Sequence, residues 1–218
     1  IDFFKHIKPI SIFFAMTVAT TIYTNLDTSM LGFMCTDADV GIYDVAVKIK
    51  VILVSIVTSL GMVLLPRASY YIENNKITEF RRVSGKAMEF VLAVSIPCTL
   101  AFTITADKCI VFLSGSAYED ATVPMRIIMP TLILIGITNI IGLQMLVPLG
   151  KEIIVLLSEI IGAVIDLILN IILIPLYGAS GAALGTLAAE TAVLLVQLLA
   201  SRNEIIEMSR QLHPIKIS

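Results

Sequence analysis

Six long apolar runs constrain the fold of this chain more than any other feature. A helix rises about 1.5 Å per residue, so roughly 20 apolar residues span the ~30 Å hydrocarbon core of a bilayer. A soluble single-domain fold does not need several runs of that length. The sequence therefore predicts an all-α polytopic membrane protein whose six transmembrane helices form one bundle, at residues 10–34, 42–65, 87–105, 125–149, 153–174 and 179–200.

Composition and charge exclude several classes of function. Hydrophobic residues make up 57% of the chain and charged residues 15%, and the mean hydropathy is +0.95. A net charge of −2 without a basic stripe argues against nucleic-acid binding. The cysteines (Cys35, Cys98 and Cys109) lack metal-ligand spacing, and His6 and His213 lie at opposite ends of the chain. We expect neither a disulfide nor a metal site.

The basic residues predict an orientation. If the six spans alternate in direction, one set of connections holds eleven lysines and arginines, and the other set holds Lys108 alone. By the positive-inside rule, both ends of the segment are then cytoplasmic. We expect the polar stretch 201–218 to be an amphipathic tail at the membrane surface. The eleven residues are Lys5, Lys8, Arg67, Lys76, Arg81, Arg82, Lys86, Lys151, Arg202, Arg210 and Lys216.

Polar residues interrupt the fifth and sixth runs near the middle of the bilayer, where an ionisable side chain is costly and points to function. Glu159, Asp166 and Asn170 share one face of the fifth predicted helix. Glu190 lies halfway along the sixth, on one face with Thr186 and Gln197. Two interpretations remain open for these stripes. In the first, the stripes form a seam of hydrogen bonds between helices. In the second, they line a hydrated site that binds substrate hydroxyls or a coupling cation, which would be H⁺ or Na⁺.

Three further charged positions are candidates at the ends of helices or within them. Asp27 lies about two turns from the outer end of the first run, where we expect it to be partly hydrated. Lys48 follows Asp44 by four residues, a spacing that permits an ion pair on one helix. Arg126 follows Pro124 at the outer end of the fourth run, where a long side chain can reach the interface without a role in transport.

The sequence contains no catalytic pattern of the Ser-His-Asp, Cys-His or HExxH type. We therefore expect a protein that is not an enzyme and needs no cofactor. The alternative from another class is a membrane enzyme of glycan assembly, but such enzymes carry large outer loops with catalytic arginines or histidines. Here the predicted outer loops contain one basic residue, Lys108.

Several short segments carry a family resemblance. Residues 26–32 (LDTSMLG), 40–43 (VGIY), 64–67 (LLPR), 115–121 (GSAYEDA) and 178–183 (GASGAA) resemble, in the same order, segments of the Wzx-type polysaccharide flippases. These proteins belong to the multidrug/oligosaccharidyl-lipid/polysaccharide exporter superfamily. The resemblance spans nearly the whole chain. It implies helices seven to twelve of a twelve-helix transporter, and hence a missing amino-terminal six-helix lobe.

The resemblance also implies an activity. Such proteins move an undecaprenyl-pyrophosphate-linked oligosaccharide across the bacterial inner membrane by alternating access, alongside glycosyltransferases and a polymerase. It assigns Lys48 and Arg126 to the pyrophosphate and Asp27, Asp166 and Asn170 to a coupling cation. We add Glu159 to the cation set and Glu190 to the substrate set. A multidrug exporter or a lipid II flippase of the same superfamily remains an alternative.

Overall fold

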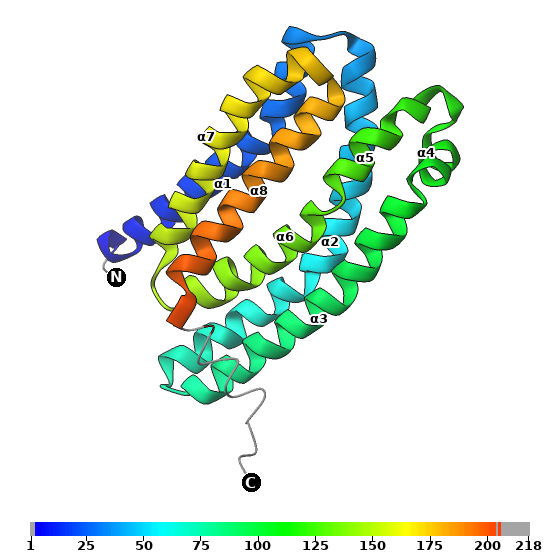
Figure 1. Ribbon diagram of the computed structural model, residues 1–218. Helices are drawn as coiled ribbons and strands as arrows, with labels where there is room; N and C mark the ends of the chain where they lie inside the picture. Colours follow the sequence, from blue (N-terminus) through cyan, green and yellow to red (C-terminus); the bar gives the residue numbers. More distant parts are fainter. Residues whose placement is uncertain (1–2, 204, 206–218) are drawn as a thin grey trace.

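The structure is a computed structural model that describes residues 3–203 and residue 205. Within these residues all regular structure is helical (Figure 1). The elements are α1 (Phe3–Met34), α2 (Asp37–Glu73), α3 (Ile77–Ile104), α4 (Ala106–Ser114), η1 (Ser116–Ala121), α5 (Thr122–Ile128), α6 (Thr131–Thr138), η2 (Asn139–Leu146), α7 (Glu152–Tyr177) and α8 (Ala179–Ala200). The predicted all-α membrane fold is confirmed. The predicted tail falls outside the described residues, apart from residues 201–203 and 205.

Among the described residues, four helices are long and apolar enough to cross a membrane: α2, α3, α7 and α8. A fifth span is possible if the two helical segments Ser116–Ile128 and Thr131–Leu146, which meet at 44°, cross together. The first predicted span, residues 10–34, lies inside the single helix α1. The chain is a multi-pass membrane protein, and the count of six stays a prediction.

Helices α2 and α3 are longer than predicted and form a hairpin. We expected Pro66 to end the second helix, but α2 continues through it to Glu73. Thr36 starts α2 with a capping box, in which its hydroxyl and the Asp39 carboxylate satisfy each other's backbone amides. Between the second and third predicted spans the connection is only a tight turn at Asn75, whose φ is 55°. The apolar surface that α2 and α3 bury together explains why the proline did not stop the helix.

The fourth predicted span is broken. Pro130 lies between α5 and α6, because it has no backbone N–H with which to continue the helical hydrogen bonds. A π-helical segment, η2, follows α6 from Asn139 to Leu146. Segments of this kind are rare in proteins and are frequent at functional sites.

The bundle has three parts (Figure 1). Helices α1, α7 and α8 lie side by side on one flank, α3 lies on the other, and α2, α5 and α6 lie between them. The turn between α1 and α2 meets the turn between α7 and α8, since Cys35 Sγ contacts the Ile174 carbonyl at 3.7 Å and Asp39 lies against Gly178. The α2–α3 turn and the end of α8 lie at the opposite end of the bundle.

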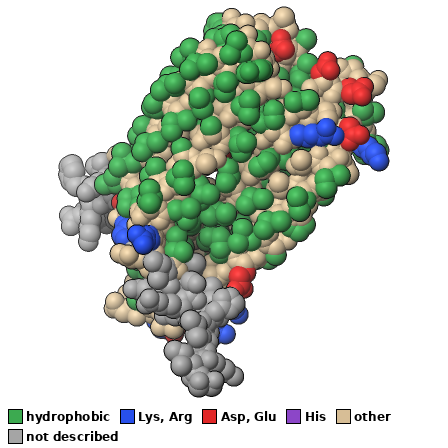
Figure 2. Space-filling model, viewed as in Figure 1, with side chains coloured by type: hydrophobic (Ala, Val, Ile, Leu, Met, Phe, Trp, Pro, Cys, Tyr) green, Lys and Arg blue, Asp and Glu red, His purple; other side chains and the backbone are tan. Residues whose placement is uncertain are grey.

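The outer surface suits a lipid environment. Hydrophobic side chains cover the face seen in Figure 2, and charged side chains gather toward its ends. Helix α7 shows the pattern clearly because its buried residues include Ser158, Asp166 and Asn170, whereas its exposed residues are apolar. A helix with polar residues inside and apolar residues outside is arranged for lipid on the outside. The exposed apolar set on α7 is Ile153, Leu157, Ile160, Ile161, Val164, Leu167, Ile168, Ile171, Ile172, Leu176 and Tyr177.

Candidate functional site

The carboxylate of Asp27 is the meeting point of four helices. Asp27 itself lies on α1 and is only 4% exposed. The hydroxyl of Tyr43 on α2 donates a short hydrogen bond to Asp27 Oδ2, and Thr186 Oγ1 on α8 lies 2.7 Å from the same oxygen. Asn170 Nδ2 on α7 donates to Asp27 Oδ1 at 2.6 Å. We expected Asp27 to be partly hydrated, and that expectation was wrong because α2, α7 and α8 close around it.

Asn170 links Asp27 to a second carboxylate. Its side-chain amide also donates to Asp166 Oδ2, one turn earlier on α7, at 3.1 Å. Asp166 lies close enough to Asp27 for the charges of the two carboxylates to interact. Two carboxyl groups in such contact cannot both stay ionised unless a proton or another cation compensates them. The arrangement therefore calls for a positive charge between the two acids.

Two buried oxygens of this cluster have no hydrogen-bond partner among the described residues: Asp166 Oδ1 and Asn170 Oδ1. Both face Gly185 of α8. A methyl group at that position would collide with Asn170 Oδ1 and would lie 3.2 Å from Asp166 Oδ1. Unpaired buried oxygens are costly, so a cluster that keeps two of them is suited to a ligand that supplies positive charge.

The oxygen atoms at the cluster form a suitable ligand set for a hard cation. The two carboxylates supply negative charge, and Asn170 Oδ1 and Thr186 Oγ1 are neutral oxygens beside them. Thr186 Oγ1 also lies 3.1 Å from the backbone carbonyl of Ala182. Hard metal cations are bound in proteins by such mixtures of carboxylate, amide, hydroxyl and backbone carbonyl oxygens.

Charged residues continue from this cluster along the seam between α7 and α8. Glu190 lies one turn beyond Thr186 on α8, is 8% exposed, and interacts electrostatically with Asp166. Glu159, half-buried on α7, interacts in turn with Glu190. Lys50 of α2 opposes these acids, because its ammonium group is attracted by Glu190, Asp27 and Asp166.

The two predicted polar stripes therefore face each other. Gln197 Nε2 of α8 donates to Ser158 Oγ of α7 at 3.0 Å, which extends the seam beyond the acids. The structure brings together Asp27, Asp166 and Asn170 of the predicted cation set. Glu159 follows farther along the seam, and Glu190, which we had assigned to substrate, lies with these acids.

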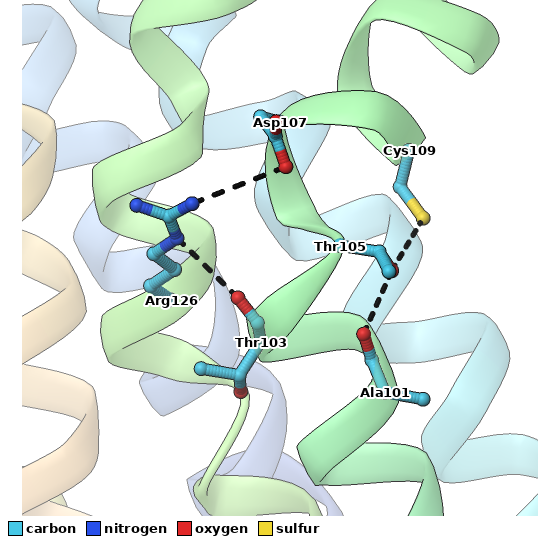
Figure 3. Close-up of polar contacts among 6 residues, drawn as sticks. All are labelled: Ala101, Thr103, Thr105, Asp107, Cys109 and Arg126. Atoms are coloured by element: carbon cyan, nitrogen blue, oxygen red, sulfur yellow. Dashed lines mark hydrogen bonds and ion pairs between the residues drawn. The ribbon is translucent and has the colours of Figure 1, made fainter.

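Lys48 and Arg126, the predicted pyrophosphate ligands, lie apart from this cluster. Lys48 pairs with Asp44 on its own helix at 3.9 Å, as its spacing predicted, and 77% of its side chain is exposed. Arg126 Nε donates to the carbonyl oxygen of Thr103 at 3.3 Å, and the guanidinium lies 3.9 Å from Asp107 (Figure 3). Arg126 thereby joins α5 to the end of α3 and the start of α4. A role of either residue in substrate binding stays a prediction.

Three contributors to the site were not among the predicted residues, although the sequence carries signals for them. Lys50 follows the buried residues Tyr43 and Ala46 by seven and four positions, a helical spacing that predicts a common face. Tyr43 belongs to a segment singled out only for its resemblance. Gly185 follows Gly181 by four positions, a spacing of small residues that is typical of helix packing in membranes. Of these two glycines, only Gly181 lies against the backbone of α7, at Leu173 and Ile174.

Comparison with known proteins now supplies a family. The sequence profile described as polysaccharide biosynthesis protein matches residues 4–123, more than half of the chain. A probable low-salt glycan biosynthesis flippase of Haloferax volcanii is 25% identical over 75% of this chain and 34% of its own length. A Shigella dysenteriae protein with the provisional name O-antigen transporter is 26% identical over 86% of this chain and 46% of its own.

A third relative is the lipid II flippase of Bacillus subtilis, 26% identical over 68% of this chain and 28% of its own length. The chain thus spans less than half the length of each of these relatives. No solved structure matches it significantly. The profile match and the named relatives agree with the resemblance seen in the short segments, and the chain belongs to the polysaccharide biosynthesis protein family of Wzx-type flippases.

Proposed function

We propose that this chain is the carboxy-terminal lobe of a flippase that moves a lipid-linked oligosaccharide across the bacterial inner membrane by alternating access. The names of the relatives support a flippase, and the apolar surface supports a membrane location. The substrate is an oligosaccharide on an undecaprenyl pyrophosphate carrier. An amino-terminal lobe completes the transporter, and glycosyltransferases and a polymerase act before and after it.

The observation that carries the mechanism is the cluster around Asp27. Four helices hold two carboxylates against each other, with an amide oxygen and a hydroxyl beside them. A single proton would need only one acceptor, whereas a set of carboxylate and neutral oxygens suits a metal cation. We infer that the cluster binds Na⁺, and that H⁺ is the alternative coupling ion.

Cation binding at this place would couple to transport because the ligands come from separate helices. A cation that holds Asp27, Asp166 and Thr186 together favours the conformation in which α1, α7 and α8 are closely packed. A ligand shifts a conformational equilibrium only by its differential affinity for the two states. Loss of the cation would therefore release these helices to rearrange, and alternating access would follow from ion binding.

The test is complementation of a flippase-null strain by the full-length transporter and its variants. Asp27→Asn and Asp166→Asn remove one charge each while keeping the side-chain size, and we expect surface polysaccharide to be lost in both. Glu79→Gln on α3 is the matched control, because that acid is exposed and outside the cluster. Full complementation by both cluster variants would contradict the coupling role.

A lipid II flippase is the second candidate function, since the Bacillus subtilis relative carries that name. Complementation of a strain depleted of its lipid II flippase separates the two. If the transporter restores growth of the lipid II flippase-depleted strain but does not restore surface polysaccharide in the flippase-null strain, its substrate is the peptidoglycan precursor. The reverse result supports an oligosaccharide repeat unit.

A further inference from the structure

Lys50 is a basic residue that faces the interior of the bundle at the height of the acids. It lies on α2 between the buried residues Ala46 and Leu53 and is itself half-buried. Lys48, two residues earlier, points the other way and is largely exposed. A lysine on the buried face of a membrane helix needs an anionic partner there.

The position of Lys50 along the helix axis matches that of its partners. Tyr43 of α2 and Thr186 of α8 meet at Asp27, with their hydroxyl oxygens 3.0 Å apart. From that level both helices run toward the same end of the bundle (Figure 1). Lys50 lies seven residues farther along α2, about 10 Å, and Glu190 lies four residues farther along α8, about 6 Å. The flexible four-carbon stem of a lysine covers the difference.

Acids outnumber bases around Lys50 among the described residues. Its ammonium group is attracted by Glu190, then by Asp27 and Asp166. Glu159 adds a fourth acid, which interacts with Glu190. One lysine therefore lies among four acids. A cation that enters the cluster meets the ammonium already there, which opposes its entry.

We propose that Lys50 is a tethered counter-cation that competes with the coupling cation for the carboxylate cluster. This inference rests on the cation site proposed above. Without the cation, the Lys50 ammonium offsets part of the negative charge of the acids. When Na⁺ binds between Asp27 and Asp166, it repels the ammonium, which then remains with Glu190 alone.

Competition between Lys50 and Na⁺ lowers the affinity of the cluster for Na⁺ to a level that permits Na⁺ release. A site with two carboxylates and no nearby cation would hold Na⁺ tightly, and slow release would limit turnover. Repulsion between two unit charges at a distance of several ångströms is substantial inside a protein, even at an effective dielectric constant of about 20. Lys50 is thus a positioning residue for the ion-release step, and α2 is the helix on which the exchange acts.

Equilibrium binding of ²²Na⁺ to the purified full-length transporter tests the proposal. Lys50→Gln removes the competing charge, and we expect Na⁺ to bind about tenfold more tightly or better, as expected from removing a repulsion of this size. Lys50→Arg keeps the charge and should stay within about threefold of wild type. Lys48→Gln is the matched control for loss of a lysine charge on α2, and its Na⁺ affinity should stay within about twofold of wild type.

A second variant keeps the test decisive if Lys50→Gln fails to fold. Glu190→Gln alone should weaken Na⁺ binding, because it frees the ammonium to compete more strongly at Asp27 and Asp166. The pair Lys50→Gln with Glu190→Gln should return the affinity to within about threefold of wild type. If the pair binds Na⁺ no better than Glu190→Gln alone, Lys50 is not a competitor.

The outcomes separate this inference from the cation site itself. Saturable Na⁺ binding by the wild type, with the same affinity in Lys50→Gln, would overturn the role of Lys50 and leave the site standing. Absence of saturable Na⁺ binding by the wild type would overturn both. Tighter binding in Lys50→Gln, together with slower ²²Na⁺ release, is the result the inference predicts.

Discussion

Gly185 of α8 lies so close to the side-chain oxygen of Asn170 on α7 that a methyl group at residue 185 would collide with it. This close approach places the unpaired side-chain oxygens of Asn170 and Asp166 against the α8 backbone, at a position that has no side chain. Small residues therefore have two different structural roles in α8. Gly181 lets two backbones meet, and Gly185 makes room for the polar side chains of Asn170 and Asp166.

Gly185→Ala should therefore impair ion binding more than folding. The added methyl displaces Asn170 Oδ1 and crowds Asp166 Oδ1, so we expect Na⁺ to bind at least about tenfold more weakly. Alanine is the better helix former by about 1 kcal/mol, which offsets part of the overpacking. Parallel ²²Na⁺ binding and thermal unfolding of the purified transporter would check this. Unchanged Na⁺ affinity would show that the close approach of Gly185 to Asn170 has no role in the site.

Gly181→Ala should have the opposite profile. Its methyl would meet the backbone of Leu173 and Ile174, which cannot move aside as a side chain can. We expect the free energy of unfolding to fall by roughly 1–3 kcal/mol as α7 and α8 separate. Gly32→Ala on α1 is the control, since its nearest neighbour, Val40, lies at an ordinary contact distance of 3.9 Å. Equal unfolding curves for the two variants would contradict the close approach.

The sequence could predict some of this site because the information was local. Asp166 and Asn170 are four residues apart on one apolar helix, and that spacing alone places them on a common face. The turn between α7 and α8 was also predictable from a local signal, the glycine at position 178. In the structure Gly178 takes a positive φ of 53°, which glycine adopts readily. The limits of α8 agree with the prediction at both ends.

Other features depend on contacts between distant segments. The burial of Asp27 requires side chains from three other helices, so its own neighbours in the sequence gave no sign of it. Pro66 reads as a helix stop in isolation, yet tertiary packing continues α2 through it. Lys48 and Lys50 are nearly adjacent in sequence, but Lys48 is exposed and Lys50 faces the interior. Only the helical spacing of the buried residues around them distinguishes the two lysines.

Tyr43→Phe tests the hydrogen bonds to Asp27 without changing the packing of the ring. The hydroxyl interacts with both Asp27 and Thr186, and hydrogen bonds between membrane helices average about 0.6 kcal/mol with a maximum near 1.7. We expect the free energy of unfolding to fall within that range. Tyr70→Phe is the matched control because Tyr70 is 52% exposed. A loss of stability no larger than that of the control would place the hydroxyl outside the network.

Arg126 offers a test of structural against substrate roles. The Arg126–Asp107 pair is about half exposed on both sides, so it should contribute no more than about 1 kcal/mol to stability. If the arginine only joins α5 to the α3–α4 junction, Arg126→Gln and Asp107→Asn should cause similar small losses of stability and of transport. A large transport defect in Arg126→Gln, absent from Asp107→Asn, would instead support binding of the substrate pyrophosphate.

The most direct measurement of the central claim is equilibrium ²²Na⁺ binding to the full-length transporter, compared between wild type and the variants Asp27→Asn and Asp166→Asn. We expect saturable binding by the wild type and its loss in both variants, because each removes a carboxylate from the site where four helices meet. Saturable Na⁺ binding of wild-type affinity in both variants would show that the two carboxylates do not form a Na⁺ site.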